Sequence, residues 1–255
     1  MTERSFDLVV IGGGSGGLAC AQRAVEYGAT VALVEASRLG GTCVNVGCVP
    51  KKVMWNAAQI AQAAHDARHY GFDLTVGAHD WPALKRSRDA YIERLNGIYE
   101  RNLAQRNVHL VRGRARLTGP SEIEVGDVHL DAAHVVIATG GRPAVPPIPG
   151  AELGYTSDGF FALEDRPQRV AVVGSGYIAV ELAGIFAALG SSVEMVIRRE
   201  RVLRHFDVML ADGLMKIMRD EGIVFHDHAV PRALERDADG SLRLQAFGVT
   251  EPTSG

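Results

Sequence analysis

Cys43 and Cys48 are the two residues best placed in this sequence to do redox chemistry. Four residues separate them in the run GGTCVNVGCVPKK, which covers positions 40–52. We expect Cys48 to lie near the start of the helix that follows, where the helix N-terminus and the nearby lysines favour the reactive thiolate. A metal site would need further cysteine or histidine ligands close by, and His65 and His69 are well removed. The alternative is a pair of buried, reduced cysteines. Cys20 has no partner, and we interpret it as an inert core residue.

A glycine-rich turn near the N-terminus has the spacing of a dinucleotide-binding loop. Gly12, Gly14 and Gly17 match the G-x-G-x-x-G pattern, follow a short apolar run and open a helical stretch. The three glycines allow a tight turn, a close approach of pyrophosphate to the backbone, and packing of helix on strand. The phosphates would sit at the helix N-terminus, where free N–H groups favour an anion. Glu35 ends the next apolar run, where an acid can accept hydrogen bonds from a ribose 2′-OH.

The same pattern returns about 160 residues later, which is the mark of an internal repeat. Gly174 and Gly176 provide the glycines, and Ala179 is the permitted third small residue. The second apolar run now ends in two arginines, Arg198 and Arg199, and Arg204 follows. Guanidinium groups suit a 2′-phosphate, so this unit is predicted to prefer NADP over NAD. The alternative is a solvated basic segment.

The hydrophobic pattern places these motifs in an α/β fold of two Rossmann-like units with parallel strands. A proline-rich connector at 143–149 predicts the boundary between residues 1–150 and residues 151–255. We expect strands at 6–11, 30–34, 135–138, 169–173 and 192–197, and helices at 17–27, 47–67, 81–105 and 180–189.

Composition limits the possible partners. The 255 residues carry a net charge of -3 with no basic tract, which argues against a nucleic-acid partner. The apolar runs are far shorter than the roughly 20 residues of a membrane span, so we expect no membrane insertion. The first residues lack the features of a secretory signal, and 3 cysteines are too few for a disulfide scaffold. We therefore expect the protein in the cytoplasm.

The run from Gly40 to Met54 closely resembles the redox motif of glutathione reductases, within the flavin-dependent pyridine nucleotide–disulfide oxidoreductases. The resemblance extends from about Phe6 to about Leu244. The lysine at position 51, where lipoamide and mercuric reductases usually have serine, favours the glutathione reductases. The resemblance implies a three-layer β/β/α organisation, with FAD and a redox-active disulfide in residues 1–150 and NADPH in residues 151–255. It also implies that the substrate is glutathione disulfide and that the assembly is a homodimer.

The family's functional residues carry over to matching positions. Cys43 would attack glutathione disulfide, and Cys48 would lie against the flavin. Lys51 would sit near the flavin, paired with Glu181 from the NADPH unit. Tyr99 matches a tyrosine that contacts glutathione, with a half-buried helix aromatic as the alternative. The positions implied to bind FAD are Gly12, Gly14, Ser15, Gly16, Gly17, Glu35, Thr42, Cys43, Lys51, Ala115, Thr139 and Gly140. Those implied to bind NADPH are Gly174, Ser175, Gly176, Tyr177, Ile178, Glu181, Arg198 and Arg204.

The sequence departs from the family pattern at its C-terminal end. Family members continue beyond the position of Gly255 to complete both nucleotide-binding domains and add a dimerisation domain, so both units are expected to be incomplete. Residues 245–255 do not resemble the strand expected there. Two other functions therefore stay open. One is a cofactor-binding fragment with little or no turnover, and the other is a reductase of a different disulfide, such as trypanothione, mycothione or lipoamide.

Overall fold

The computed structural model describes residues 2–248, which fall into two compact units. The described part of the first unit comprises residues 2–50 and 86–142, and that of the second comprises residues 51–85 and 143–248. Two long helices, α3 (Cys48–Asp66) and α4 (Trp81–Gln105), contribute residues to both units. None of the helices in the described residues is both long and apolar enough to cross a membrane.

The first unit is built on a six-stranded sheet with the order β3-β2-β1-β6-β5-β4. Strands β1, β2, β3 and β6 are parallel, whereas β5 and β4 continue the sheet in antiparallel pairing. Their bounds are β1 (Thr2–Ile11), β2 (Val31–Glu35), β3 (His109–Arg112), β4 (Arg116–Leu117), β5 (Glu122–Val125) and β6 (Val128–Ile137). The carboxyl ends of the parallel strands therefore meet at one edge, which is where ligands bind in open α/β sheets.

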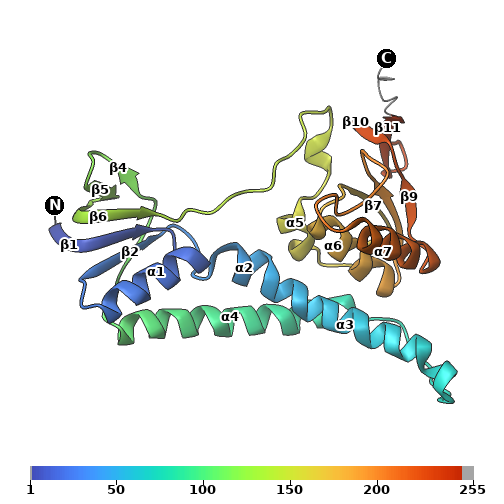
Figure 1. The fold of residues 1–255 in the computed structure, drawn as a ribbon, viewed down its shortest axis with the longest axis horizontal. Coiled ribbons are helices and arrows are strands. Elements are labelled where there is room, and N and C mark those ends of the chain that lie inside the picture. Colours follow the sequence, from blue (N-terminus) through green and yellow to red (C-terminus); the bar gives the residue numbers. More distant parts are fainter. Residues whose placement is uncertain (1, 249–255) are drawn as a thin grey trace. The chain divides into compact units, whose positions relative to one another are not determined.

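Successive side chains of the parallel strands point to opposite faces of the sheet, and packing on both faces gives this unit three layers. Val10 packs on one face with Leu18 of α1 (Ser15–Glu26) and Leu103 of α4. Val9 packs on the other face with Ile123 of β5 and with residues of β6. Figure 1 shows α1 along one side of the sheet and the β4–β5 hairpin on the other. The predicted α/β class with a parallel, Rossmann-like sheet is confirmed, and helices and an antiparallel hairpin cover its two faces.

The second unit contains a three-stranded parallel sheet with the order β7-β8-β9, followed by an antiparallel pair, β10 and β11. Its helices include α5, α6 and α7, and its buried core includes Ile185 of α6 and Met215 of α7. The bounds are η1 (Ala67–Tyr70), η2 (Ala151–Leu153), α5 (Ser157–Ala162), β7 (Arg169–Val173), α6 (Tyr177–Ala188), β8 (Ser192–Val196), α7 (Val208–Asp220), β9 (Val224–His226), β10 (Ala229–Arg236) and β11 (Leu242–Gly248).

A buried aromatic cluster stabilises the second unit. The Trp81 indole is stacked on Phe186 at a centroid distance of 5.9 Å and meets Phe160 edge-on at the same distance. Its indole N–H donates to the carbonyl oxygen of Leu163 at 3.1 Å. Aromatic pairs in these geometries add about 0.5–1.5 kcal/mol beyond the burial of their area. The first turn of α4 is therefore held by side-chain packing as well as by its own periodicity.

The predicted helix at 81–105 and strand at 169–173 match the structure residue for residue. Three helices were not predicted: α2 (Gly41–Val46), α5 and α7. The expectation for the C-terminal end was wrong in part, because Gln245 to Gly248 belong to β11 and pair with β10. That pairing supplies the regular backbone hydrogen bonds which the residue types alone did not suggest. Residues 249–255 lie outside the described residues.

Candidate functional site

The first glycine turn is packed too tightly for any other residue at two positions. Gly12 has φ +109°, and a Cβ there would lie 2.3 Å from the carbonyl oxygen of Ala138. A Cβ on Gly17 would lie 1.8 Å from the carbonyl oxygen of Gly12. Helix α1 begins at Ser15, and its N-cap residue, Gly14, provides no side-chain hydrogen bond. The first N–H groups of α1 are therefore open to an anion. This bare backbone fits the pyrophosphate of a dinucleotide.

Glu35 lies beside this turn at the end of β2. Its Oε2 accepts a hydrogen bond from the N–H of Gly13 at 2.6 Å, and its Oε1 accepts one from Ser37 at 2.7 Å. Each carboxylate oxygen has further lone pairs, so accepting from a ribose hydroxyl is compatible with these bonds. Glu35 thus fixes the turn as well as standing where the sequence predicts a ribose ligand.

The cysteine motif is attached directly to the glycine turn within the first unit. The N–H of Gly40 donates to the carbonyl oxygen of Gly13 at 2.8 Å. Gly41 follows with φ +57°, and a Cβ on it would lie 2.7 Å from the Cα of Gly14. Helix α2 then carries Thr42 and Cys43. Gly41 is therefore needed for backbone-on-backbone contact between the redox motif and the glycine turn, whereas the φ of +97° is what favours glycine at position 40.

The two thiols lie close together, with Cys43 in α2 and Cys48 as the first residue of α3. Both are free, Cys43 is half-buried and Cys48 is exposed. Burial raises the pKa of the Cys43 thiol, and its contact with Cys48 raises it further, while a hydrogen bond from Ser15 acts in the opposite direction. Gly47 lies between them, and a Cβ there would come within 2.7 Å of the carbonyl oxygen of Thr42. The two thiols interact directly, which is a prerequisite for a reversible disulfide.

A pair of asparagines that sequence reasoning missed holds this motif in place. Asn45, between the two cysteines, donates from Nδ2 to the carbonyl oxygens of Leu39 at 3.0 Å and Gly41 at 2.9 Å. Asn96 of α4 donates from Nδ2 to the same Leu39 oxygen at 2.8 Å and to Oδ1 of Asn45 at 3.1 Å. These hydrogen bonds of the side-chain amides are partly buried, so removing one partner would leave a polar group unsatisfied at a cost in free energy. The network fixes the backbone on the N-terminal side of Cys43.

Other predicted FAD positions lie on the same edge of the sheet. Ala138 directly follows β6, and its N–H donates to the carbonyl oxygen of Ile11 at 2.8 Å, so Thr139 and Gly140 emerge beside the glycine turn. Ala115 follows β3 and packs against the sheet core. A Cβ added to Gly16, next to the turn, would have no atom within 4 Å. The structure thus brings these sequence-predicted positions together, although their contact with a flavin stays a prediction.

Tyr99 is a half-buried aromatic residue of α4. It packs half-buried against the core between α1 and the sheet. It also lines a cavity of about 240 Å³ together with Ser15, the first residue of α1, and Val44 of α2. The other lining residues are Leu18, Ala19, Gln22 and Gly40. A place in the lining of this cavity is compatible with substrate contact, and that role stays a prediction.

The second glycine turn is looser than the first. Gly174 has φ +137°, and a Cβ there would lie 3.5 Å from the Cβ of Ala179, an ordinary contact. That spacing accounts for an alanine at the third position. Helix α6 begins at Tyr177 after Gly176, which again provides no side-chain cap. An anion site is therefore also open at this helix start.

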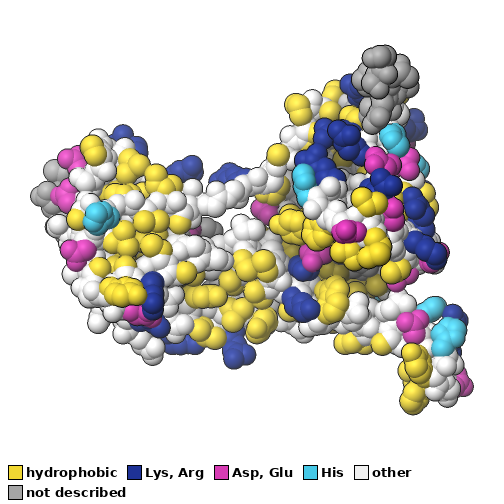
Figure 2. Space-filling view, in the orientation of Figure 1, with side chains coloured by type: hydrophobic (Ala, Val, Ile, Leu, Met, Phe, Trp, Pro, Cys, Tyr) yellow, Lys and Arg dark blue, Asp and Glu magenta, His cyan; other side chains and the backbone are white. Residues whose placement is uncertain are grey.

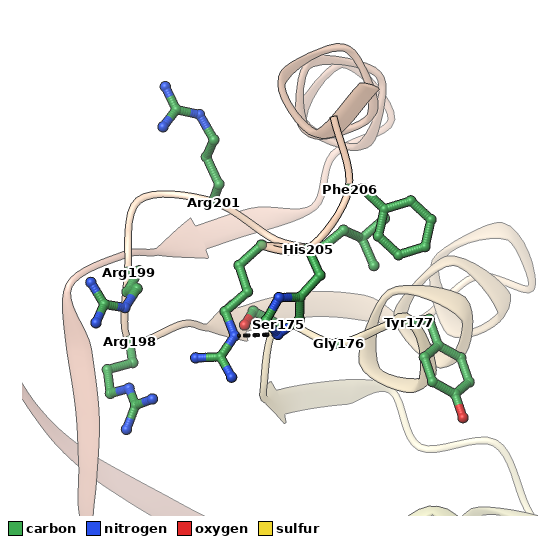
Figure 3. A pocket seen from close by; sticks show the side chains of 10 residues that line it. Ser175, Gly176, Tyr177, Arg198, Arg199, Arg201, His205 and Phe206 are labelled. Carbon is green, nitrogen blue, oxygen red and sulfur yellow. Dashed lines mark hydrogen bonds between the residues drawn. The ribbon is translucent and has the colours of Figure 1, made fainter. Parts of the chain in front are cut away.

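Basic residues surround a cavity of about 390 Å³ beside this second turn (Figure 3). Figure 2 shows basic side chains gathered on one face of this unit. Arg201 forms hydrogen bonds with two carboxylates: its Nε donates to Asp212 at 2.6 Å and its Nη1 donates to Glu200 at 2.8 Å. Arg198 and Arg204 have no ion pair within the described residues. The lining residues are Ser175, Gly176, Tyr177, Arg198, Arg199, Arg201, Leu203, Arg204, His205 and Phe206. The cavity is of the size that holds small ligands.

Lys51 and Glu181 form the ion pair that the family resemblance implies. The Nζ of Lys51 lies 2.6 Å from Oε1 of Glu181, and their side chains are 23% and 36% exposed. Glu181 lies one helical turn after Tyr177, so the two share a face of α6. Tyr177 is 64% exposed and lines the arginine-rich cavity, whereas Ile178 is exposed and does not line it. The pairing is present, and its action on a flavin stays a prediction.

These features define an α/β protein with two Rossmann-like glycine turns and a pair of cysteines beside the first of them. Residues 6–252 match the family described as pyridine nucleotide-disulphide oxidoreductase, and the chain belongs to that family. The match extends past Leu244, where the resemblance was expected to end.

Two curated relatives are similar over most of the chain. It is 51% identical over 250 residues to the glutathione reductase of Schizosaccharomyces pombe, covering 94% of this chain and 54% of the relative. It is 49% identical over 247 residues to the glutathione reductase of Yarrowia lipolytica, covering 91% of this chain and 53% of the relative. The chain therefore spans about half the length of the curated relatives it matches.

Proposed function

We propose that this chain binds FAD and NADPH and takes part in NADPH-dependent reduction of glutathione disulfide through Cys43 and Cys48. The observation that carries the proposal is the direct attachment of the cysteine motif to the dinucleotide turn, through the bond from Gly40 to Gly13 at 2.8 Å. The family match and the names of the two curated relatives support the same function.

The FAD site would be formed by the bare backbone of the first turn, by Glu35 at the ribose and by Thr139 and Gly140 at the same edge. The NADPH site would be formed by the second turn, with Arg198 and Arg204 at the 2′-phosphate. A bound flavin would supply two-electron transfer from NADPH to the cysteine pair. The 2.6 Å contact with Glu181 would hold the Lys51 ammonium group in a fixed position beside α6. Because cysteine is scarce and the pair must be reducible, we propose a reducing compartment such as the cytoplasm.

The thiols would then reduce the substrate by exchange. The Cys43 thiolate attacks one sulfur of glutathione disulfide, and one glutathione leaves as a thiolate that takes up a proton. Cys48 then attacks the Cys43 sulfur of the mixed disulfide, which releases the second glutathione and forms the Cys43–Cys48 disulfide. The dithiol loses two electrons and the substrate gains them, so the exchange balances.

The chain's own thiols test this proposal without a need for turnover. The Cys48→Ser variant, reduced and mixed with glutathione disulfide, should trap one glutathione on Cys43, as measured by intact and peptide mass spectrometry. Cys43→Ser is the matched variant and should react more slowly. A trapped glutathione on Cys20 alone, or faster trapping in Cys43→Ser than in Cys48→Ser, would contradict the assignment of Cys43.

The same trap separates the alternative substrates. Glutathione disulfide should react with Cys48→Ser faster than trypanothione disulfide, mycothione disulfide or lipoamide does. Preference for another of these would keep the enzyme class and change the substrate. Cofactor binding with no thiol exchange would favour a cofactor-binding fragment with little turnover.

A further inference from the structure

A short turn holds Arg204 and His205 at the rim of the arginine-rich cavity. Leu203 has φ +52°, a left-handed conformation that is unfavourable for a residue with a side chain. Its N–H donates to the carbonyl oxygen of Ser175 at 2.7 Å, and its own carbonyl oxygen accepts from the N–H of Phe206 at 2.7 Å. The two bonds keep the chain in this conformation and attach it to the second glycine turn.

Within this turn, the Nε of Arg204 donates to the Nε2 of His205 at 3.0 Å, the contact drawn as a dashed line in Figure 3. An acceptor Nε2 requires a neutral imidazole with its proton on Nδ1. The bond uses only the Nε–H of the guanidinium, so both terminal NH₂ groups of Arg204 are left for a ligand.

Arg201 provides the contrast on the same loop. Its Nε is bonded to Asp212 and its Nη1 to Glu200, so its charge is matched by two carboxylates. Figure 3 shows its side chain pointing away from His205. The partner of Arg204 is uncharged instead. A neutral acceptor orients a guanidinium without cancelling its charge, and a planar, pre-oriented fork is what bidentate phosphate binding needs.

We propose that His205 is a positioning residue that determines specificity for NADPH, by holding the Arg204 guanidinium toward the 2′-phosphate. The inference rests on the proposed NADPH site. His205 itself makes no bond to the phosphate. It restricts the rotation of Arg204, which reduces the conformational entropy lost when the phosphate binds.

The test compares two probes that differ only in the 2′-phosphate, 2′,5′-ADP and 5′-AMP, each titrated by calorimetry into the full chain at a pH of about 8, where imidazoles are mostly neutral. The ratio of their dissociation constants isolates the contribution of the 2′-phosphate. His205→Leu removes the acceptor and should lower the preference for 2′,5′-ADP about three- to tenfold, the range expected for one hydrogen bond. His205→Gln places an amide oxygen near the position of Nε2 and should restore it.

The control is His226→Leu, which removes an imidazole bonded to Glu194 elsewhere in the same unit and should leave the ratio unchanged. An unchanged ratio in His205→Leu would overturn the proposal. So would an equal loss in the Leu and Gln variants, because the acceptor would then not matter.

Arg204→Gln separates this inference from the proposed NADPH site. If neither Arg204→Gln nor Arg198→Gln lowers the preference for 2′,5′-ADP, the proposed NADPH site itself is wrong. If the arginine variants lower the preference and His205→Leu does not, only the role of His205 is wrong.

Discussion

Removing the Asn96 amide should loosen the cysteine motif without touching either thiol. Asn96→Ala deletes the bonds to the Leu39 carbonyl at 2.8 Å and to Oδ1 of Asn45 at 3.1 Å. The Leu39 oxygen keeps its bond from Asn45 at 3.0 Å, whereas the Oδ1 of Asn45 loses the hydrogen bond that it accepts from Asn96. At a net value of about 0.5–1.5 kcal/mol for each bond, the loss is about 1–3 kcal/mol.

Part of that free energy should appear in the thiol chemistry. The network fixes the backbone at Leu39 and Gly41, next to Cys43, so we expect that loosening it lowers the effective concentration of the two thiols for each other. Each 1.4 kcal/mol corresponds to a tenfold change in an equilibrium constant. We expect the equilibrium constant for forming the Cys43–Cys48 disulfide to fall by up to about tenfold in Asn96→Ala.

The assay equilibrates the chain in buffers of reduced and oxidised glutathione, quenches with acid, alkylates the free thiols and counts them by mass spectrometry. Asn102→Ala is the matched control, because Asn102 lies on the same helix and no side-chain hydrogen bond of it is present within the described residues. Asn45→Ala and the double variant complete a double-mutant cycle, which should give a coupling of about 1 kcal/mol. The same equilibrium constant for disulfide formation in Asn96→Ala and Asn102→Ala would refute this prediction. So would strictly additive effects of Asn45→Ala and Asn96→Ala in the double-mutant cycle.

Three further predictions concern the first unit. Gly17→Ala should abolish FAD binding in equilibrium dialysis, because its Cβ would lie 1.8 Å from a carbonyl oxygen, whereas Gly97→Ala, whose Cβ would meet only the end of the Arg101 side chain at 3.4 Å, should bind normally. Added FAD should slow alkylation of the exposed Cys48 by iodoacetamide more than that of Cys43, and equal protection would argue against Cys48 lying next to the flavin. The hydrogen bond from the Ser15 hydroxyl lowers the pKa of Cys43, against the effect of burial, so Ser15→Ala should raise that pKa further. The alkylation of Cys43 should then be slower at a pH of about 8 to 9, and an unchanged rate would contradict this prediction.

The parts of the fold that the sequence predicted are those in which local pattern and geometry coincide. The helix at 81–105 was predicted because its apolar residues repeat at helical spacing, and the Trp81 cluster reinforces its first turn. The glycine turns were predicted because a backbone that must approach other backbone tolerates little besides glycine, as Gly12 and Gly17 demonstrate. Local constraints of this kind leave a clear mark on residue type.

Features that depend on distant partners could not be predicted from local pattern. Asn45 and Asn96 are 51 residues apart, and neither amide has a neighbouring residue type that suggests the other. Leu203 adopts a left-handed conformation because of its bonds to Ser175 and Phe206, although its residue type argues against that conformation. The end of β11 was missed for the same reason, since its regularity comes from pairing with β10.

We propose that the first unit holds FAD against a working thiol pair and that the second unit delivers reducing equivalents from NADPH. The most direct test is the absorbance spectrum of the purified chain with FAD, recorded before and after NADPH. We predict a bound-flavin spectrum that bleaches on reduction and gains a long-wavelength flavin–thiolate band, which is absent from Cys48→Ser. A chain that remains colourless after FAD is added and free FAD removed, or a long-wavelength band that survives in Cys48→Ser, would contradict the claim.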